Sequence, residues 1–215
     1  MTTDDLISVA ILVVIFLGIA FPVHEFAHAY VAYRLGDGTA KLFGRLTLNP
    51  VVHFDPMGGL LLVISALSSA ALTGGGFIFG WAKPTPVNPS NLRDRRNGEV
   101  LVAIAGPVSN LIMAVLGALV WRALDVFAII PPVIFDRILL SFVAYNIALA
   151  IFNLIPVPPL DGSAILFRLV SPQTAWRLRP MLAQYGLILV IVFVLFGGAF
   201  LGRVIFGVTR LLLGV

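Results

Sequence analysis

Two histidines and a glutamate stand close together in the segment His24–His28, which reads HEFAH and ends an otherwise uncharged apolar run. On a helix, residues four apart lie on the same face, so His24 and His28 can reach one metal ion while Glu25 stands beside it as a proton acceptor. Ionisable side chains are costly in hydrocarbon, so these three need something to bind. The alternative is a histidine pair satisfied by hydrogen bonds between helices. The pattern predicts a zinc site and a hydrolase inside the membrane.

The zinc site needs a third protein ligand, because a catalytic zinc usually has three ligands and a water. The chain has no cysteine, so its ligands must be nitrogen or oxygen. Outside the HExxH segment, Asp161 is the acidic residue most closely flanked by apolar sequence on both sides. We therefore predict that Asp161 is the third ligand. The same residue is placed to cap a short helix over residues 163–170, and it can serve as both cap and ligand. Such a ligand set also fits divalent metals other than zinc.

Two further polar residues have more than one reading. Asn110 follows Gly106-Pro107 within an apolar stretch, where it could donate to a developing oxyanion, hold Glu25, or join two helices by hydrogen bonds. His53 could be a fourth ligand in a resting state, but a solvated histidine at the membrane interface is the simpler interpretation.

The composition shows what kind of element must position these residues. Of 215 residues, 60% are hydrophobic and 11% are charged, and the mean hydropathy is +1.04. Soluble domains carry roughly 25% charged residues, so this is an integral membrane protein. The net charge is +4, but the basic residues are scattered between apolar spans. This distribution is typical of interfacial anchors and excludes a nucleic-acid interface.

Four long apolar stretches, uncharged except for Glu25, are predicted to be membrane helices, at residues 6–33, 100–121, 138–159 and 181–202. Residues 204–215 extend the last helix or form a short interfacial one. The fold class is therefore an all-α polytopic membrane protein with about four to six membrane helices. We treat residues 1–215 as one domain, with a core at 6–170 and C-terminal helices at 181–215.

The segment 36–97, between the first two spans, has a different pattern. Residues 39–48 partly alternate between polar and apolar, which predicts a short strand. Residues 60–73 form an apolar run that is too short for a full crossing and is closed by Gly74-Gly75-Gly76. Such a run is typical of a re-entrant element. Residues 77–89 are rich in proline and predict strand or turn.

Charge counting and metal geometry both favour the re-entrant interpretation. If residues 60–73 do not cross, the 14 basic residues divide ten to four between the two sides. The positive-inside rule then places segment 36–97 in the cytoplasm and the N-terminus outside. Asp161 can meet His24 and His28 most easily if the first and third spans run in the same direction, which requires one crossing between them. Both arguments place the site nearer the cytoplasmic side.

Three motifs follow one another in the chain: HExxH at 24–28, Gly106-Pro107-x-x-Asn110, and NxxPxPxLDG at 153–162. In this order they resemble the site-2 protease family, the intramembrane zinc metalloproteases of peptidase family M50, in its minimal prokaryotic form without PDZ or CBS domains. The resemblance covers about residues 6–170.

The resemblance implies particular roles. His24, His28 and Asp161 correspond to the ligands of one zinc ion per chain, Glu25 to the catalytic base that acts with a zinc-activated water, and Asn110 and Asn153 to active-site support. It also implies a transmembrane protein as the substrate and a prokaryotic inner membrane as the location.

Two other classes of function remain open from the residues. A membrane metal transporter also places histidine and aspartate in the membrane, but it would repeat such positions along a pathway. A catalytically silent membrane binding protein would keep the fold after losing Glu25 or a metal ligand. This sequence has Glu25 and all three predicted ligands.

Overall fold

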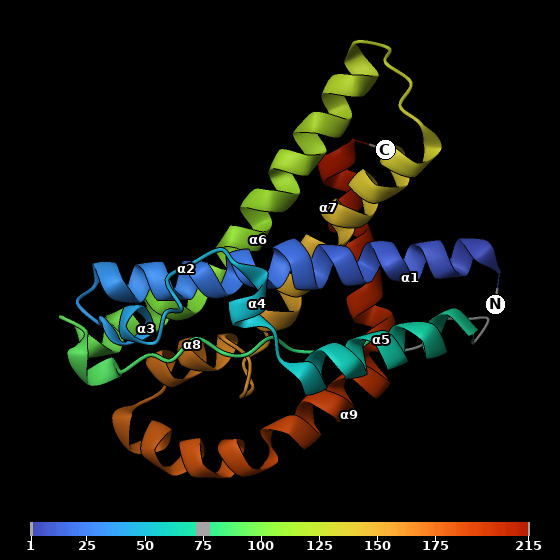
Figure 1. Ribbon diagram of the computed structural model, residues 1–215. Helices are drawn as coiled ribbons and strands as arrows, with labels where there is room; N and C mark the ends of the chain where they lie inside the picture. Colours follow the sequence, from blue (N-terminus) through green and yellow to red (C-terminus); the bar gives the residue numbers. More distant parts are fainter. Residues whose placement is uncertain (1, 72–77, 215) are drawn as a thin grey trace.

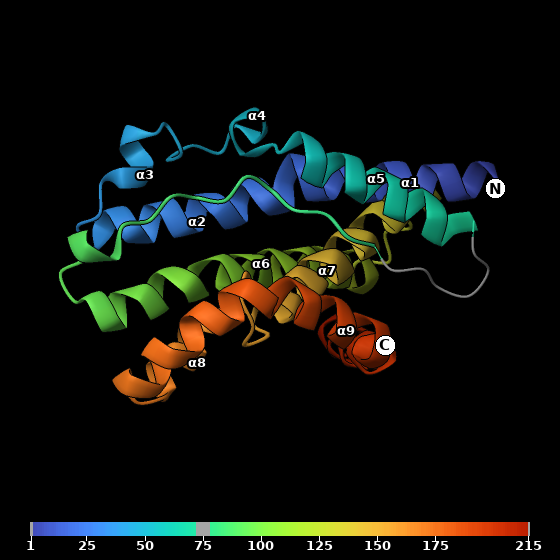
Figure 2. The same ribbon diagram turned by 90° about the horizontal axis from the view of Figure 1, so that it is seen from below.

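The fold is helical throughout the part of the chain that the structure describes. The structure is a computed structural model that describes residues 2–71 and 78–214. Every regular element in these ranges is a helix, and four of the helices are long and apolar enough to cross a membrane. Figure 1 shows these long helices crossing one another, and Figure 2 shows the same bundle from below. The predicted all-α polytopic membrane protein is confirmed.

The first spanning segment is continuous but contains one wider turn. Its parts are α1 (Thr3–Ile15), the π-helical turn η1 (Phe16–Ala20) and α2 (Phe21–Arg34). Just after this turn, the N–H of Phe21 reaches back five residues to the carbonyl of Phe16. Pro22 has no N–H to donate, so a regular helix would lack a hydrogen bond at this point. The helix is therefore loosened just before His24.

The other three spans agree with the predicted ones and are mostly longer. They are α6 (Arg95–Val126), α7 (Val133–Asn153) and α9 (Pro172–Leu213). The third span ends at Asn153 and not near residue 159, because three prolines follow in the next six residues and cannot continue a helix. A short helix, α8 (Gly162–Leu169), joins α7 to α9.

The core of the bundle is the contact of α6 with α2 on one side and with α7 on the other. Small residues allow the approach: Ala114, Ala118 and Gly117 of α6 face Val143 of α7 and its neighbours. α6 begins near the end of α2 and runs back along it, whereas α7 runs in the same direction as α2 (Figure 2). The first and third spans are therefore parallel, as the metal geometry requires.

The segment predicted to be re-entrant contains a helix and a returning chain. α5 (Pro56–Ala71) has 16 residues, so it is about 24 Å long and shorter than the ~30 Å hydrocarbon core. The chain after it lies back against α5, where the hydroxyl of Ser65 bonds to both the N–H and the carbonyl of Phe79. A Cβ on Gly58 would lie 2.0 Å from the carbonyl oxygen of Trp81, so this return requires glycine. The glycines 74–76 lie outside the described residues.

The strand predicted over residues 39–48 is wrong. This stretch holds a one-turn helix, α3 (Thr39–Leu42), followed by turns, and α4 (Pro50–His53) begins just after it. The carboxylate of Asp37 accepts both the N–H and the hydroxyl of Thr39, which starts the helix. Gly44, with φ +69°, then ends it in a conformation that suits glycine. Local side-chain capping overrides the alternating pattern. Residues 78–88 form neither helix nor strand, and η2 (Pro89–Asn91) follows.

Asp37 also fixes the returning chain to the end of α2. Its fully buried carboxylate accepts the N–H of Asn88 at 2.6 Å and the side-chain amide of Asn91 at 2.9 Å. Burial by itself raises the pKa of Asp37, but the hydrogen bonds from Thr39, Asn91 and Asn88 outweigh it and lower the pKa below 3.8. The carboxylate is therefore the form that stabilises this junction.

We expect Asp37→Asn to lower the free energy of unfolding by about 1–3 kcal/mol, because buried donors lose a charged acceptor. A lowered pKa in the folded state contributes stability above pH 3.8, and this contribution is lost as the pH falls towards the folded-state pKa. The melting temperature of the wild type in detergent should therefore fall more steeply with acidification than that of Asp37→Asn. Asp125→Asn, at an exposed carboxylate, is the control. Parallel pH curves for wild type and Asp37→Asn would contradict the assignment.

Candidate metal centre

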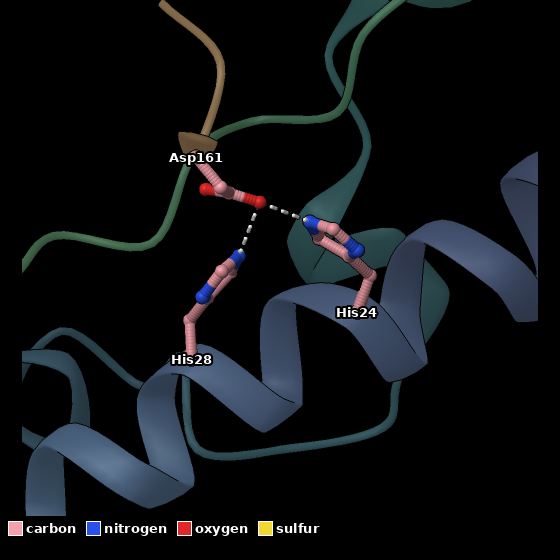
Figure 3. Close-up of side chains that lie close together, drawn as sticks. All are labelled: His24, His28 and Asp161. Carbon is pink, nitrogen blue, oxygen red and sulfur yellow. Dashed lines mark hydrogen bonds and ion pairs between the residues drawn. The ribbon is translucent and has the colours of Figure 1, made fainter. Parts of the chain in front are cut away.

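His24 and His28 lie one turn apart on α2 and face the interior of the bundle. Their side chains are almost fully buried, and the two rings are 4.7 Å apart between centroids, at an interplanar angle of 82°. This edge-to-face arrangement directs both Nε2 atoms to the same side of the helix (Figure 3). The spacing of four residues therefore has the consequence predicted from the sequence.

Asp161 comes from a distant part of the chain to complete the group. It stands at the N-cap position of α8, but its side chain caps nothing. Its Oδ2 lies instead 3.1 Å from Nε2 of His24 and 3.3 Å from Nε2 of His28 (Figure 3). Its Oδ2 therefore faces the same point as the two imidazole nitrogens.

The three side chains fit a tetrahedral metal. One ligand atom from each lies within 4.8 Å of the other two. Nitrogen and oxygen ligands at about 2.0–2.1 Å from a tetrahedral zinc are about 3.3 Å apart. The two distances to Oδ2, 3.1 and 3.3 Å, match this separation. In the described ranges, this is the one group of three such residues that could hold a metal ion.

The outer nitrogens of both imidazoles are already committed to oxygen acceptors. Nδ1 of His24 lies 2.5 Å from Oδ1 of Asn110, and Nδ1 of His28 lies 2.7 Å from the carbonyl of Val102. A carbonyl oxygen can only accept, so each Nδ1 carries a proton, and the neutral form of each imidazole then has its lone pair on Nε2. In that form two lone pairs and a carboxylate oxygen face one another, an arrangement that suits a cation between them.

Gly106 of α6 leaves room for this convergence. A Cβ at this position would lie 2.4 Å from Nε2 of His28 and 2.5 Å from Nε2 of His24. Any other residue would therefore displace the ligand atoms themselves. The glycine of the second motif is thus explained by space at the metal site, in addition to close helix packing.

Glu25 is held from the opposite side by the returning chain. Its Oε2 accepts the N–H of Thr85 at 2.8 Å, and the hydroxyl of Thr85 donates to the main-chain carbonyl of Glu25 at 3.0 Å. Glu25 lines the same cavity as His24, His28 and Asp161. The arrangement therefore combines a metal-binding group with a neighbouring carboxylate that can accept a proton.

The cavity has a volume of about 690 Å³ and mostly apolar walls. They come from α2, α6, the end of α7, the turn before α8, α9 and the returning segment. Asn153 lines the cavity, and its amide donates to the carbonyl of Leu149 at 3.0 Å. Arg179 of α9 also lines it and donates to Glu99 of α6 at 2.9 Å, which ties these two helices together.

The other candidate residues lie in different places from those expected. Asn110 is fully buried beside His24 and is hydrogen-bonded to His24 and Asn146, not to Glu25. His53 is not a solvated interfacial residue, because only 1% of it is exposed, and its Nε2 bonds to the carbonyl of Thr47 at 2.8 Å. It is not part of the metal-binding group.

Sequence reasoning missed two residues that contact this site. Thr85 lies between two prolines in a stretch with no helical or strand pattern, so nothing in the sequence indicates its contact with Glu25. Asn146 did carry a signal, because an amide in the middle of an apolar span needs a partner. That signal does not identify the partner.

Known proteins are similar to this chain over most of its length. A sequence profile described as peptidase family M50 matches residues 132–197, which include Asn153 and Asp161. The chain is 40% identical over 183 residues to the candidate zinc metalloprotease YwhC of Bacillus subtilis, which covers 83% of this chain and 78% of that protein.

More distant relatives carry similar names. The candidate zinc metalloprotease Rip2 of Mycobacterium tuberculosis is 32% identical over 197 residues, covering 89% of this chain and 70% of that protein. The zinc metalloprotease MJ0392 of Methanocaldococcus jannaschii is 25% identical over 184 residues, which is 85% of this chain and 42% of that protein. No solved structure matches the chain.

Metal analysis of the purified protein should find about one zinc per chain. His24→Ala, His28→Ala and Asp161→Ala should each lose most of this zinc, because two remaining ligands do not complete a tetrahedral site. His53→Asn, at a buried histidine outside the group, should keep it. Undiminished zinc in any of the three ligand variants would remove that residue from the site.

We expect Gly106→Ala to abolish zinc binding, since its Cβ would meet both Nε2 atoms at 2.4–2.5 Å. Gly117→Ala is the matched control on the same helix. Its Cβ would meet apolar atoms of Val143 and Phe142, the nearest at 2.9 Å, and would lower stability without touching the ligands. Zinc content and melting temperature, measured on both variants, separate the two effects. A Gly106→Ala protein with full zinc would show that the helices can move apart there.

Proposed function

Because this chain belongs to peptidase family M50 and is a zinc metalloprotease, we propose that it cleaves peptide bonds within or beside the transmembrane segments of other membrane proteins. One observation carries the proposal. The ligand atoms of His24, His28 and Asp161 converge within 4.8 Å inside the bundle, in a mostly apolar cavity that Glu25 also lines.

Each polar residue of the site has a role in this proposal. His24, His28 and Asp161 hold one zinc ion, which when bound lowers the pKa of a water molecule and polarises the peptide carbonyl. Glu25 accepts a proton from the water that attacks the carbonyl and then gives it to the leaving amine. Thr85 holds Oε2 of Glu25, so Oε1 is the oxygen that we assign to this proton transfer.

The two asparagines support the reaction in different ways. Asn153 lines the cavity close to the turn that carries Asp161, and we assign it to the substrate carbonyl, towards which its amide can donate. Asn110 does not line the cavity walls, and its contact with Nδ1 of His24 supports a role in orienting that ligand.

The substrate class follows from the walls of the cavity and from the chemistry of a helix. A mostly apolar cleft between membrane helices suits an apolar segment. A helical substrate hides its carbonyls in backbone hydrogen bonds, so it must unwind locally before attack. The returning chain at 78–88 is not paired in a sheet, and we propose that it offers an edge to the unwound segment. Pro84 and Pro86 lack N–H groups, so at these two positions the segment could offer a substrate only its carbonyl oxygens.

We also propose an orientation in a prokaryotic inner membrane. Ten of the 14 basic residues lie from the last residue of α2 to the second residue of α6, or between the end of α7 and the early part of α9, and the remaining four are Arg122, Arg137, Arg203 and Arg210. The positive-inside rule then favours a cytoplasmic location for the end of α2 and for the metal centre near it, with the N-terminus outside.

A comparison of cells that express the wild type or Glu25→Gln tests the reaction. Membrane proteomics should find fragments that end within or beside transmembrane segments only in the wild-type cells, because loss of a general base lowers the rate by about 10²–10⁴-fold. The purified Glu25→Gln protein should keep its zinc, since the side chain at position 25 is not a ligand. Asp125→Asn is the matched control and should cleave normally.

Wild-type fragment patterns from Glu25→Gln cells would contradict the base assignment. Proteoliposomes test the transporter alternative directly. Uptake of zinc by the wild type, without cleavage of any co-reconstituted membrane protein, would favour transport over proteolysis.

A further inference from the structure

A row of three hydrogen bonds leads from the backbone of α7 to the first histidine of the site. The side-chain amide of Asn146 donates to the carbonyl of Phe142 at 2.8 Å, and the amide of Asn110 donates to Oδ1 of Asn146 at 2.9 Å. Oδ1 of Asn110 then lies 2.5 Å from Nδ1 of His24. Both asparagines are fully buried, and His24 is 4% exposed. No solvent molecule is needed to complete this row.

The direction of every bond in the row is determined by its first member. The carbonyl of Phe142 can only accept, so Asn146 must turn its NH₂ group towards it and its oxygen towards Asn110. Asn110 must then present its own NH₂ group to Asn146. Its oxygen is left facing His24, where it can bond only to a protonated Nδ1.

We infer that Asn146 is a positioning residue, which acts through Asn110 to keep the proton of His24 on Nδ1 and the lone pair on Nε2. The inference rests on the proposed binding of zinc by His24. It deepens that proposal by naming what makes this histidine a ligand in its free state. Without Asn146, Asn110 can rotate and donate to Nδ1, which moves the imidazole proton to Nε2 and blocks metal binding.

The two histidines differ in the partner of their Nδ1 atoms, and only His24 needs a second residue to orient that partner. Nδ1 of His28 faces the main-chain carbonyl of Val102, which cannot change from acceptor to donor. Nδ1 of His24 faces a side-chain amide, which can present either end. His24 is therefore the ligand whose tautomer has to be specified by a further residue.

Asn146→Leu removes the side-chain oxygen that orients the amide of Asn110, and it keeps the approximate volume of the side chain. We expect its zinc affinity to fall about 10–100-fold, as for other residues that orient metal ligands. Chelator competition on the detergent-purified protein measures this change. Tyr145→Phe, at the neighbouring position of α7, controls for disturbance of the helix and should bind zinc as the wild type does.

Repeating the test in the Asn110→Asp variant shows whether the effect depends on the direction of the hydrogen bonds between Asn146, Asn110 and His24. In Asn110→Asp, the carboxylate can only accept, so it keeps the proton on Nδ1 of His24 whatever stands at position 146. Asn146→Leu should therefore change zinc affinity by less than about threefold in the Asn110→Asp background, although it changes it strongly in the wild type. A merely structural role for Asn146 would give the same loss in both.

The protonated nitrogen can also be read without metal. The chain has three histidines, so the ¹⁵N imidazole signals of the metal-free protein can be assigned with His28→Ala and His53→Asn. In the Asp161→Ala background, which removes the carboxylate 3.1 Å from Nε2, we expect His24 to carry its proton on Nδ1 when Asn146 is present and on Nε2 after Asn146→Leu. If the leucine variant does not fold, Asn146→Asp takes its place: it keeps an acceptor for Asn110 and should leave the proton on Nδ1.

Unchanged zinc affinity and an unchanged ¹⁵N pattern in Asn146→Leu would overturn the inference, even if the melting temperature fell. So would a proton on Nε2 in Asn146→Asp. Failure of the proposed metal site looks different, because wild type and His24→Ala would then bind zinc equally.

Discussion

The structure depends on three lone pairs that are made to face one another in an apolar interior. Nε2 of His24, Nε2 of His28 and Oδ2 of Asp161 are all acceptors once each Nδ1 donates its hydrogen bond to a carbonyl oxygen. Such a group is unfavourable in a medium of low dielectric constant unless a cation binds it. Binding of a divalent metal relieves this repulsion between the three acceptors, and the relief contributes to the affinity for the metal.

This convergence constrains the helices around it. Two ligands share one face of α2, but the third follows α7, so both chain segments must arrive from the same side of the bundle. That requires one crossing between them, which α6 provides by running back along α2 (Figure 2). It also requires α6 to lie so close to α2 that only glycine fits at position 106. The crossing by α6 and the absence of a side chain at Gly106 are thus both needed to bring the three ligands together.

The sequence predicted those parts of the protein that follow from composition and local spacing. Four spans, the i and i+4 histidines and an isolated aspartate in an apolar region all have such signals. Residues 39–48 were mispredicted because the carboxylate of Asp37 binds Thr39 and starts a helix there, which an alternating pattern does not reveal. Thr85 and Asn146 contact the site only through the way segments pack in space, so their partners could not be derived from spacing.

The two halves of the site are held by different kinds of structure. The ligands and their partners Asn110 and Val102 lie on long helices or on the turn after one, where packing fixes each position. Glu25 instead has its carboxylate held by Thr85, from a segment with no regular structure of its own. Helix packing therefore fixes the metal ligands, whereas the orientation of the base, and with it the direction of its free Oε1, depends on how the segment around Thr85 lies against α2.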